Sequence, residues 1–192
     1  MGEGCFGKVA KCQVNSTCEL VAVKILKDEV VENVQHELTM LSRISTLNAD
    51  HFNLVKFYER FEYFGCTCLV FELLVMDLLQ FLRTELGSSM YVHQIRPIAK
   101  QWHCKAAFYS LTKMMLVALQ GLQSHWIIHT DIKLDNVMLA NHEDTPYKVK
   151  LIDFVLAIPS SAAKCRMQLQ PIGSRGIIYK LIMVINKHVN NI

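Results

Sequence analysis

Hydrophobic and polar residues alternate along residues 21–26, where the chain reads Val-Ala-Val-Lys-Ile-Leu. A period of two residues is typical of a β-strand, and it places Ala22, Lys24 and Leu26 on one face of that strand. A lysine is costly to bury without a partner, so we expect an anionic group near Lys24. The alternative is that Lys24 lies on an edge strand and extends to water.

Between residues 28 and 45 the apolar positions recur every three or four residues, which is typical of an amphipathic α-helix. Glu37 borders this apolar stripe, so its carboxylate is a candidate partner for Lys24. The other interpretation is an ordinary glutamate at the flank of a helix. The stripe comprises Val31, Val34, Leu38, Leu41 and Ile44.

Two short stretches carry most of the chemical information, His-Thr-Asp-Ile-Lys-Leu-Asp-Asn at 129–136 and Ile-Asp-Phe at 152–154. Phosphoryl transfer needs a base for the acceptor hydroxyl, a cation for the moving phosphate and oxygen ligands for Mg²⁺. Asp131 and Asn136 have the D-x-x-x-x-N spacing of a protein-kinase catalytic loop. Taken alone, the first stretch could equally be a solvated turn, because Asp and Asn favour turns.

The chain opens with a glycine-rich segment in which Gly2, Gly4, Gly7 and Val9 fit the pattern G-x-G-x-x-G-x-V. Glycine lets a backbone approach phosphate groups closely, because it has no Cβ. Such turns are common, so this match is weak on its own. The order of glycine-rich strand-turn-strand, strand lysine, helix glutamate, catalytic loop and Asp-Phe pair favours a kinase-like fold over chance matches.

With these motifs the chain resembles the eukaryotic protein kinases, and among them the homeodomain-interacting protein kinases with their dual-specificity tyrosine-regulated and Cdc2-like relatives. The closer resemblance rests on segments 48–50, 58–61, 67–74, 95–97 and 146–154. It implies an α+β, two-lobed fold. A β-rich upper lobe would cover residues 1–72, a hinge 73–77, a partial helical lower lobe 78–173 and an atypical tail 174–192.

The resemblance also implies roles in catalysis. Lys24 would hold the α- and β-phosphates of ATP while Glu37 orients the lysine. Asp131 would accept or align the proton of the substrate hydroxyl, and Lys133 would neutralise the γ-phosphate. The Mg²⁺ ligands would be Asn136 and Asp153.

For the nucleotide base, the resemblance implies an apolar sandwich and a set of hinge contacts. The adenine would lie between side chains of the upper sheet and one from the lower lobe, and the hinge backbone would hydrogen-bond its edge. The residues in question are Val9 and Ala22 above the base, Met138 below it, Glu72 to Leu74 along its edge, Phe71 behind it and Asp77 near the ribose.

Several departures from the family pattern bear on activity. Thr130 replaces the usual arginine of the catalytic loop, although a small residue there is typical of these relatives. Val155 stands where kinases have glycine, and its β-branched side chain should restrict movement of that loop. No tyrosine lies between residues 152 and 176, so activation by tyrosine phosphorylation there is not expected. Segment 102–114 is additional relative to the family pattern and lies within the predicted long helix before the catalytic loop. It either lengthens that helix by about 3.5 turns or bulges from it.

Composition narrows the class of protein. Hydrophobic residues make up 52% of the chain and charged residues 19%, which argues against disorder. A scattered net charge of +3 gives no indication of nucleic-acid binding. The apolar run at 177–185 is nine residues long, whereas a membrane-spanning helix needs about twenty. Seven cysteines without C-x-x-C spacing indicate reduced thiols.

Two functions remain open at this point. One is a protein serine/threonine kinase that uses ATP and Mg²⁺ to phosphorylate a protein substrate. The other is a truncated, catalytically impaired kinase-like protein that binds nucleotide or a partner without turnover. Kinases have further helices at the place of the atypical tail 174–192, and their absence would leave apolar surface exposed and lower the stability. The resemblance implies an intracellular, nuclear location, and the sequence predicts neither a membrane anchor nor an oligomeric state.

Overall fold

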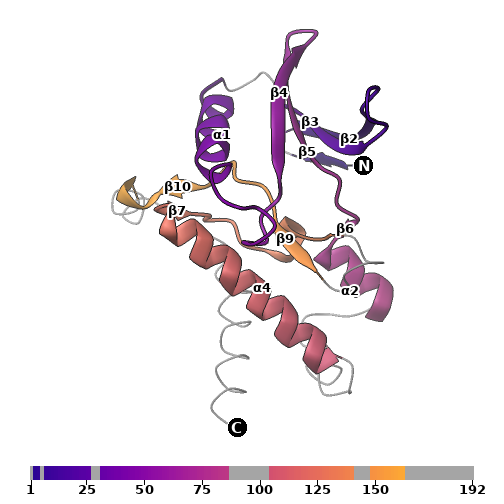
Figure 1. Ribbon diagram of the computed structural model, residues 1–192, viewed down its shortest axis with the longest axis vertical. Helices are drawn as coiled ribbons and strands as arrows, with labels where there is room; N and C mark the ends of the chain where they lie inside the picture. The colour runs from indigo at the N-terminus through magenta and orange to yellow at the C-terminus, as the bar shows by residue number, and fades with distance from the viewer. Residues whose placement is uncertain (1, 5–6, 27–30, 87–103, 141–147, 163–192) are drawn as a thin grey trace.

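The computed structural model of the chain describes residues 2–4, 7–26, 31–86, 104–140 and 148–162. A five-stranded antiparallel sheet forms the upper part, and helices with two small sheets form the lower part (Figure 1). This is the α+β, two-lobed architecture that the sequence predicts. The upper sheet has the strand order β1-β2-β3-β5-β4, with β1 (Gly2–Gly4), β2 (Gly7–Gln13), β3 (Leu20–Leu26), β4 (Phe57–Tyr63) and β5 (Cys66–Glu72).

Strand β3 lies at the centre of this sheet, and its two faces have different environments. Val21 and Val23 are buried in a small hydrophobic cluster on one face. Leu26 belongs to the main core on the other face. Lys24 shares the face of Leu26 because side chains alternate along a strand, so it projects toward the main core rather than to water.

Helix α1 (Val31–Ile44) lies beside the sheet (Figure 1). Leu41 and Ile44 are buried in the main core, and Val34 and Leu38 pack against it. From Val34 onward, the apolar stripe that the sequence shows is therefore the face that the helix buries. Residues 28–30, where the sequence predicts the start of this helix, lie outside the described residues.

Among the described residues, the lower part contains two α-helices and two small antiparallel sheets. Helix α2 (Leu78–Leu86) follows β6 directly, and α4 (Cys104–Ser124) is the long helix at the base of Figure 1. One sheet has the order β6-β8-β9, from β6 (Met76–Asp77), β8 (Val137–Leu139) and β9 (Val149–Leu151), and the other pairs β7 (Ile127–Ile128) with β10 (Ile158–Pro159). Two short 3₁₀ turns lie at Leu134–Asn136 and Ser160–Ala162.

Helix α4 decides between the two alternatives for the additional segment. The helix is continuous over Cys104–Ser124, so the segment lengthens it from residue 104 onward. Met114 in this part contacts the lower sheet, because its Sδ lies 3.4 Å from the backbone nitrogen of Val149. Further along, a Cβ on Gly121 would lie 2.6 Å from the ring of Phe52, so the helix packs there at a distance that only glycine allows. Residues 102–103 and the tail 174–192 lie outside the described residues.

One continuous core connects the upper and lower parts. It includes Leu26 and Leu69 of the sheet, Leu41 of α1, Leu122 of α4 and Phe154, all of them buried. Because these side chains share one cluster, the arrangement of the sheet relative to the lower strands is set by hydrophobic packing.

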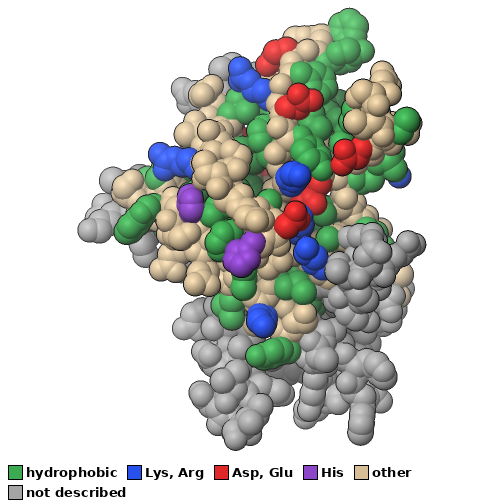
Figure 2. Space-filling model, viewed as in Figure 1, with side chains coloured by type: hydrophobic (Ala, Val, Ile, Leu, Met, Phe, Trp, Pro, Cys, Tyr) green, Lys and Arg blue, Asp and Glu red, His purple; other side chains and the backbone are tan. Residues whose placement is uncertain are grey.

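The surface view shows hydrophobic side chains along β4 and at its turn into β5, and acidic and basic side chains interspersed (Figure 2). Strand β4 is an edge of the sheet, and Tyr63 and Phe64 at its end are 60% and 88% exposed. Among the helices that the structure describes, none is both long and apolar enough to cross a membrane.

Candidate active site

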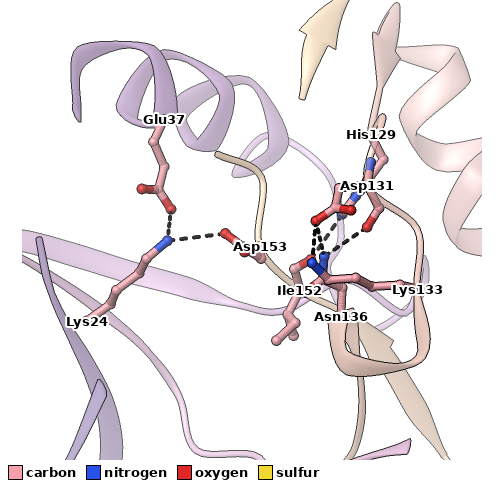
Figure 3. Close-up of polar contacts among 8 residues, drawn as sticks. All are labelled: Lys24, Glu37, His129, Asp131, Lys133, Asn136, Ile152 and Asp153. Atoms are coloured by element: carbon pink, nitrogen blue, oxygen red, sulfur yellow. Dashed lines mark hydrogen bonds and ion pairs between the residues drawn. The ribbon is translucent and has the colours of Figure 1, made fainter. Parts of the chain in front are cut away.

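Lys24 lies between two carboxylates that come from distant parts of the chain (Figure 3). Its Nζ donates a hydrogen bond of 2.6 Å to Oε1 of Glu37 on α1 and one of 3.2 Å to Oδ1 of Asp153. Glu37 is 2% exposed. Burial raises the pKa of its carboxyl group, and the positive charge of Lys24 opposes that shift. The anionic partner expected for Lys24 is therefore present, and the alternative of an edge lysine extending to water is wrong.

A second polar group lies on the loop between β7 and β8 (Figure 3). Nζ of Lys133 is 2.8 Å from Oδ2 of Asp131. The side-chain nitrogen of Asn136 donates to the same Oδ2 at 2.9 Å and to the main-chain oxygen of Asp131 at 2.8 Å. The hydrogen bond to Asp131 raises the pKa of Lys133, which keeps its amine protonated. The loop thus holds a carboxylate and a cation side by side in a fixed orientation.

His129 connects this loop to the strand that leads to Asp153. It is 2% exposed, and its Nε2 lies 3.0 Å from the main-chain oxygen of Ile152. Its ring meets that of Phe154 edge-on, with centroids 5.1 Å apart. Burial lowers the pKa of His129, so the ring is neutral at pH 7 and donates its single N–H to the carbonyl. Sequence reasoning gave His129 no role, although the residue opens the motif that identified the loop.

Asp153 and Asn136 each keep one oxygen atom that no described residue donates to. Oδ1 of Asp153 is engaged by Lys24, and the nitrogen of Asn136 is engaged by Asp131. The two segments of backbone that carry these residues are joined by a hydrogen bond of 2.9 Å from the backbone nitrogen of Ile152 to the main-chain oxygen of Asn136.

The donor set formed by these two residues fits a hard cation. Carboxylate and amide oxygens are ligands that Mg²⁺ accepts, and this ion usually takes few protein ligands and completes its shell with phosphate oxygens and water. In the described ranges no three His, Cys, Asp or Glu residues form a metal cluster. Two such oxygens would leave most of the coordination shell of a bound Mg²⁺ to ligands other than these residues.

The backbone after this site differs from what the family pattern suggests. Asp153 has a φ of 62°, in the left-handed region that residues other than glycine rarely adopt. Val155, which stands where kinases have glycine, has a negative φ and is 6% exposed. The unusual backbone conformation is thus at Asp153, and the valine side chain fills part of the core. Whether Val155 restricts movement of the loop stays a prediction.

The glycine-rich segment forms the two paired strands that the sequence predicts, and residues 5–6 between them lie outside the described residues. Gly2 pairs with Val9 and Gly4 pairs with Gly7 across strands β1 and β2. Gly7 has a φ of 154°, and a Cβ there would overlap the carbonyl oxygen of Ile25, so this position requires glycine. Val9 is the cross-strand partner of Lys24, which brings the glycine strands next to the lysine.

The residues predicted to surround the adenine lie on strands β2, β3, β5, β6 and β8 and on the connection from β5 to β6. Ala22 is two residues from Lys24 on the same face of β3, and Met138 of β8 pairs with Asp77 of β6. Oδ1 of Asp77 accepts a hydrogen bond of 2.7 Å from the backbone nitrogen of Gln80, so Asp77 caps helix α2. That capping role was not predicted. Glu72 is the last residue of β5, and residues 73–75 connect it to β6. Contact of Glu72 to Leu74 with a base stays a prediction.

Lys150 is a residue of this region that sequence reasoning missed. It is 2% exposed, and its Nζ lies 2.6 and 2.8 Å from the two carboxylate oxygens of Glu72 and 2.6 Å from Oδ1 of Asp50. Glu72 is the last residue of β5, and Lys150 lies in β9 three residues before Asp153, so this ion pair joins the end of β5 to the strand that leads to the candidate metal ligand. Its only signal in the sequence is a lysine between two apolar residues, in a strand of three residues that is too short to show a period.

Comparison with known proteins gives a consistent result. A family model for the protein kinase domain matches residues 1–171. Homeodomain-interacting protein kinase 1 from Mus musculus is 41% identical over 172 residues, which is 88% of this chain and 13% of the relative. Homeodomain-interacting protein kinase 4 from Homo sapiens is 34% identical over 156 residues, 80% of this chain and 23% of the relative. The chain thus spans less than a quarter of the length of these relatives.

The fold agrees with these similarities in sequence. A crystal structure of a kinase domain superimposes with a TM-score of 0.68 at 23% identity, covering 91% of this chain and 53% of the other. A likeness at this level of identity supports the fold alone. Together with the family model and the relatives that are more than 30% identical, it leads to one conclusion: the chain belongs to the protein kinase family.

Proposed function

We propose that the chain transfers the γ-phosphoryl group of ATP to serine or threonine hydroxyl groups of a protein substrate. The observation that carries this proposal is that two polar groups, one around Lys24 and one around Asp131, are joined through the backbone hydrogen bond from Ile152, next to Asp153, to Asn136. Lys24 and Asp131 themselves are more than a hundred residues apart in the sequence. Membership of the protein kinase family supports the same function. Positioning and electrostatic stabilisation account for most of the catalysis in this reaction, so a preformed arrangement is what the chemistry requires.

Each polar group then has a task. Lys24, held by Glu37, would bind the α- and β-phosphate oxygens through charge-assisted hydrogen bonds. Asp131 would orient the acceptor hydroxyl and accept its proton, and the amine of Lys133 would stabilise the charge on the transferred group. Mg²⁺, when bound with the nucleotide, would neutralise phosphate charge, and its protein ligands would be Asn136 and Asp153.

The same proposal places the rest of the nucleotide along the upper sheet and the hinge. The glycine strands would cover the phosphates, because their backbone can approach closely. The base would contact apolar side chains from both parts of the molecule, and the hinge backbone would recognise its edge. These residues are Gly2, Gly4 and Gly7 over the phosphates, Val9, Ala22 and Met138 around the base, Glu72 and Leu74 at its edge, and Asp77 near the ribose.

Substitution of Asp131 by asparagine tests the function. The purified chain is incubated with Mg-ATP and a basic protein, and phosphate incorporation is measured. Asp131→Asn should lower the rate at least about 100-fold, as expected for loss of a general base. Asp135→Asn is the matched control, since this exposed carboxylate lies on the same loop. Its rate should stay within about a factor of two of the unmodified chain.

Thermal stability with and without Mg-ATP separates catalysis from binding. Stabilisation without phosphate incorporation would favour the alternative, a kinase-like protein that binds nucleotide without turnover. Equal incorporation by the unmodified chain and Asp131→Asn would refute the assignment of Asp131.

A further inference from the structure

Two consecutive backbone carbonyl groups just after Phe154 are held by side chains from different parts of the molecule. The main-chain oxygen of Leu156 accepts a hydrogen bond of 2.6 Å from the hydroxyl of Thr130. The main-chain oxygen of Ala157 lies 2.6 Å from Nε2 of His36 on helix α1. A carbonyl oxygen only accepts hydrogen bonds, so Nε2 of His36 carries the hydrogen in this contact.

The two donors are adjacent to residues of the candidate active site. His36 directly precedes Glu37, so its hydrogen bond fixes helix α1 at the position that presents the partner of Lys24. Thr130 directly precedes Asp131 and has a φ of 66°, a backbone conformation that needs support from its surroundings. Each hydrogen bond is therefore made by a residue that directly precedes a residue of the candidate active site.

The segment that receives these two hydrogen bonds also makes backbone–backbone hydrogen bonds with its neighbours. Strand β10 pairs with β7, as Figure 1 shows, with Ile158 opposite Ile128. The backbone nitrogen of Ser160 donates to the main-chain oxygen of Trp126 at 2.8 Å, and that of Ala157 donates to Phe154 at 3.1 Å. Ala157 is fully buried, so water does not compete for its hydrogen bonds.

We propose that His36 and Thr130 are positioning residues that clamp residues 154–158 and so keep Glu37 and Asp153 around Lys24 without phosphorylation of this segment. This proposal rests on the proposed kinase function and explains how the active site around Lys24 is kept assembled. The absence of tyrosine between residues 152 and 176 is consistent with it. Thr130 stands where an arginine is usual, and its short hydroxyl reaches the backbone directly.

Hydrogen–deuterium exchange of the amides at 154–160 tests the clamp without requiring activity. Thr130→Val removes the hydroxyl at nearly constant shape, and His36→Leu removes the ring donor. Both should speed exchange in this segment by about tenfold or more while amides in α4 are unchanged, because a local opening becomes easier. Thr130→Ser and His36→Gln retain a donor and should restore slow exchange. Gln35→Leu, at an exposed position beside His36, is the control.

Kinetics and phosphatase treatment complete the test. Thr130→Val and His36→Leu should lower kcat about 10- to 100-fold with little change in the KM for the protein substrate, since misplacement of catalytic groups acts on the chemical step. Phosphatase treatment of the chain without substitutions should change neither kcat nor the hydrogen–deuterium exchange of the amides at 154–160. Unchanged exchange in both variants, or loss of activity after phosphatase treatment, would overturn the clamp. If the unmodified chain transfers no phosphate, the proposed function fails, and the exchange data still decide the clamp.

Discussion

Replacement of Lys150 by methionine should destabilise the chain strongly. Methionine keeps most of the length and volume of the side chain but removes the ammonium group, so the change isolates the charge. The carboxylate of Glu72 would lose both of its contacts with Nζ, at 2.6 and 2.8 Å. It would retain the hydrogen bond of 2.6 Å from the backbone nitrogen of Lys56.

The magnitude follows from the exposure of the three side chains. Lys150 is 2% exposed and Glu72 19%, whereas Asp50 is 66% exposed and contributes little. Breaking a buried ion pair costs about 3–5 kcal/mol, and the partial exposure of Glu72 reduces this to about 2–3 kcal/mol. For a chain of this size, that loss lowers the melting temperature by about 4–12 °C.

Urea unfolding of four variants provides the measurement. Lys148→Met is the matched control, because Lys148 precedes the same strand and is only partly buried. The double variant Lys150→Met with Glu72→Gln should recover at least about 1 kcal/mol, since it no longer leaves an unpaired carboxylate. Glu72→Gln alone completes the cycle. A Lys150→Met chain within about 0.5 kcal/mol of the unmodified one would refute the view that this ion pair stabilises the hinge.

Two further predictions concern stability. Acidification below the ordinary histidine pKa of about 6.5 should destabilise the chain, because burial lowers the pKa of His129 in the folded state and the unfolded chain then binds the additional proton. The unfolding free energy of His129→Gln should depend less on pH between about 5 and 7, and an unchanged slope would contradict the assignment. Gly121→Ala should cost about 1–2 kcal/mol despite the better helix propensity of alanine, because the added Cβ would lie 2.6 Å from the ring of Phe52. Urea unfolding measures this, with Lys113→Ala on the exposed side of α4 as control; stabilisation of Gly121→Ala would show that Phe52 moves without cost.

The contact between Lys24 and Glu37 could be predicted because two independent periodicities led to it. Alternation placed the lysine on one face of a strand with Ala22 and Leu26, and the spacing of apolar residues placed the glutamate beside the apolar stripe of a helix. The order of the motifs along the chain then favoured their contact over an edge lysine and an ordinary flank glutamate. Both segments are long enough for a period to be recognised. The grouping of Asp131, Lys133 and Asn136 could be predicted for a different reason, since their spacing holds these polar residues within one short stretch. Their catalytic roles stay predictions.

The ion pair of Lys150 could not be predicted with the same rules. Its strand is only three residues long, too short to show a period, and its partners Glu72 and Asp50 are 78 and 100 residues away. The hydrogen bond of His36 is harder still, because its acceptor is a backbone carbonyl that every residue has, 121 residues away. Contacts of this kind depend on how the elements pack, and no local pattern encodes them.

The shared cluster of Leu26, Leu41, Leu69, Leu122 and Phe154 also has a consequence for how the molecule loses its structure. Without the helices of the lower part, the hydrophobic side chains of the upper sheet would be exposed to water, and the reverse also holds. Neither part is therefore expected to stay folded by itself. Calorimetry should therefore record a single cooperative melting peak, with sheet and helices disappearing together.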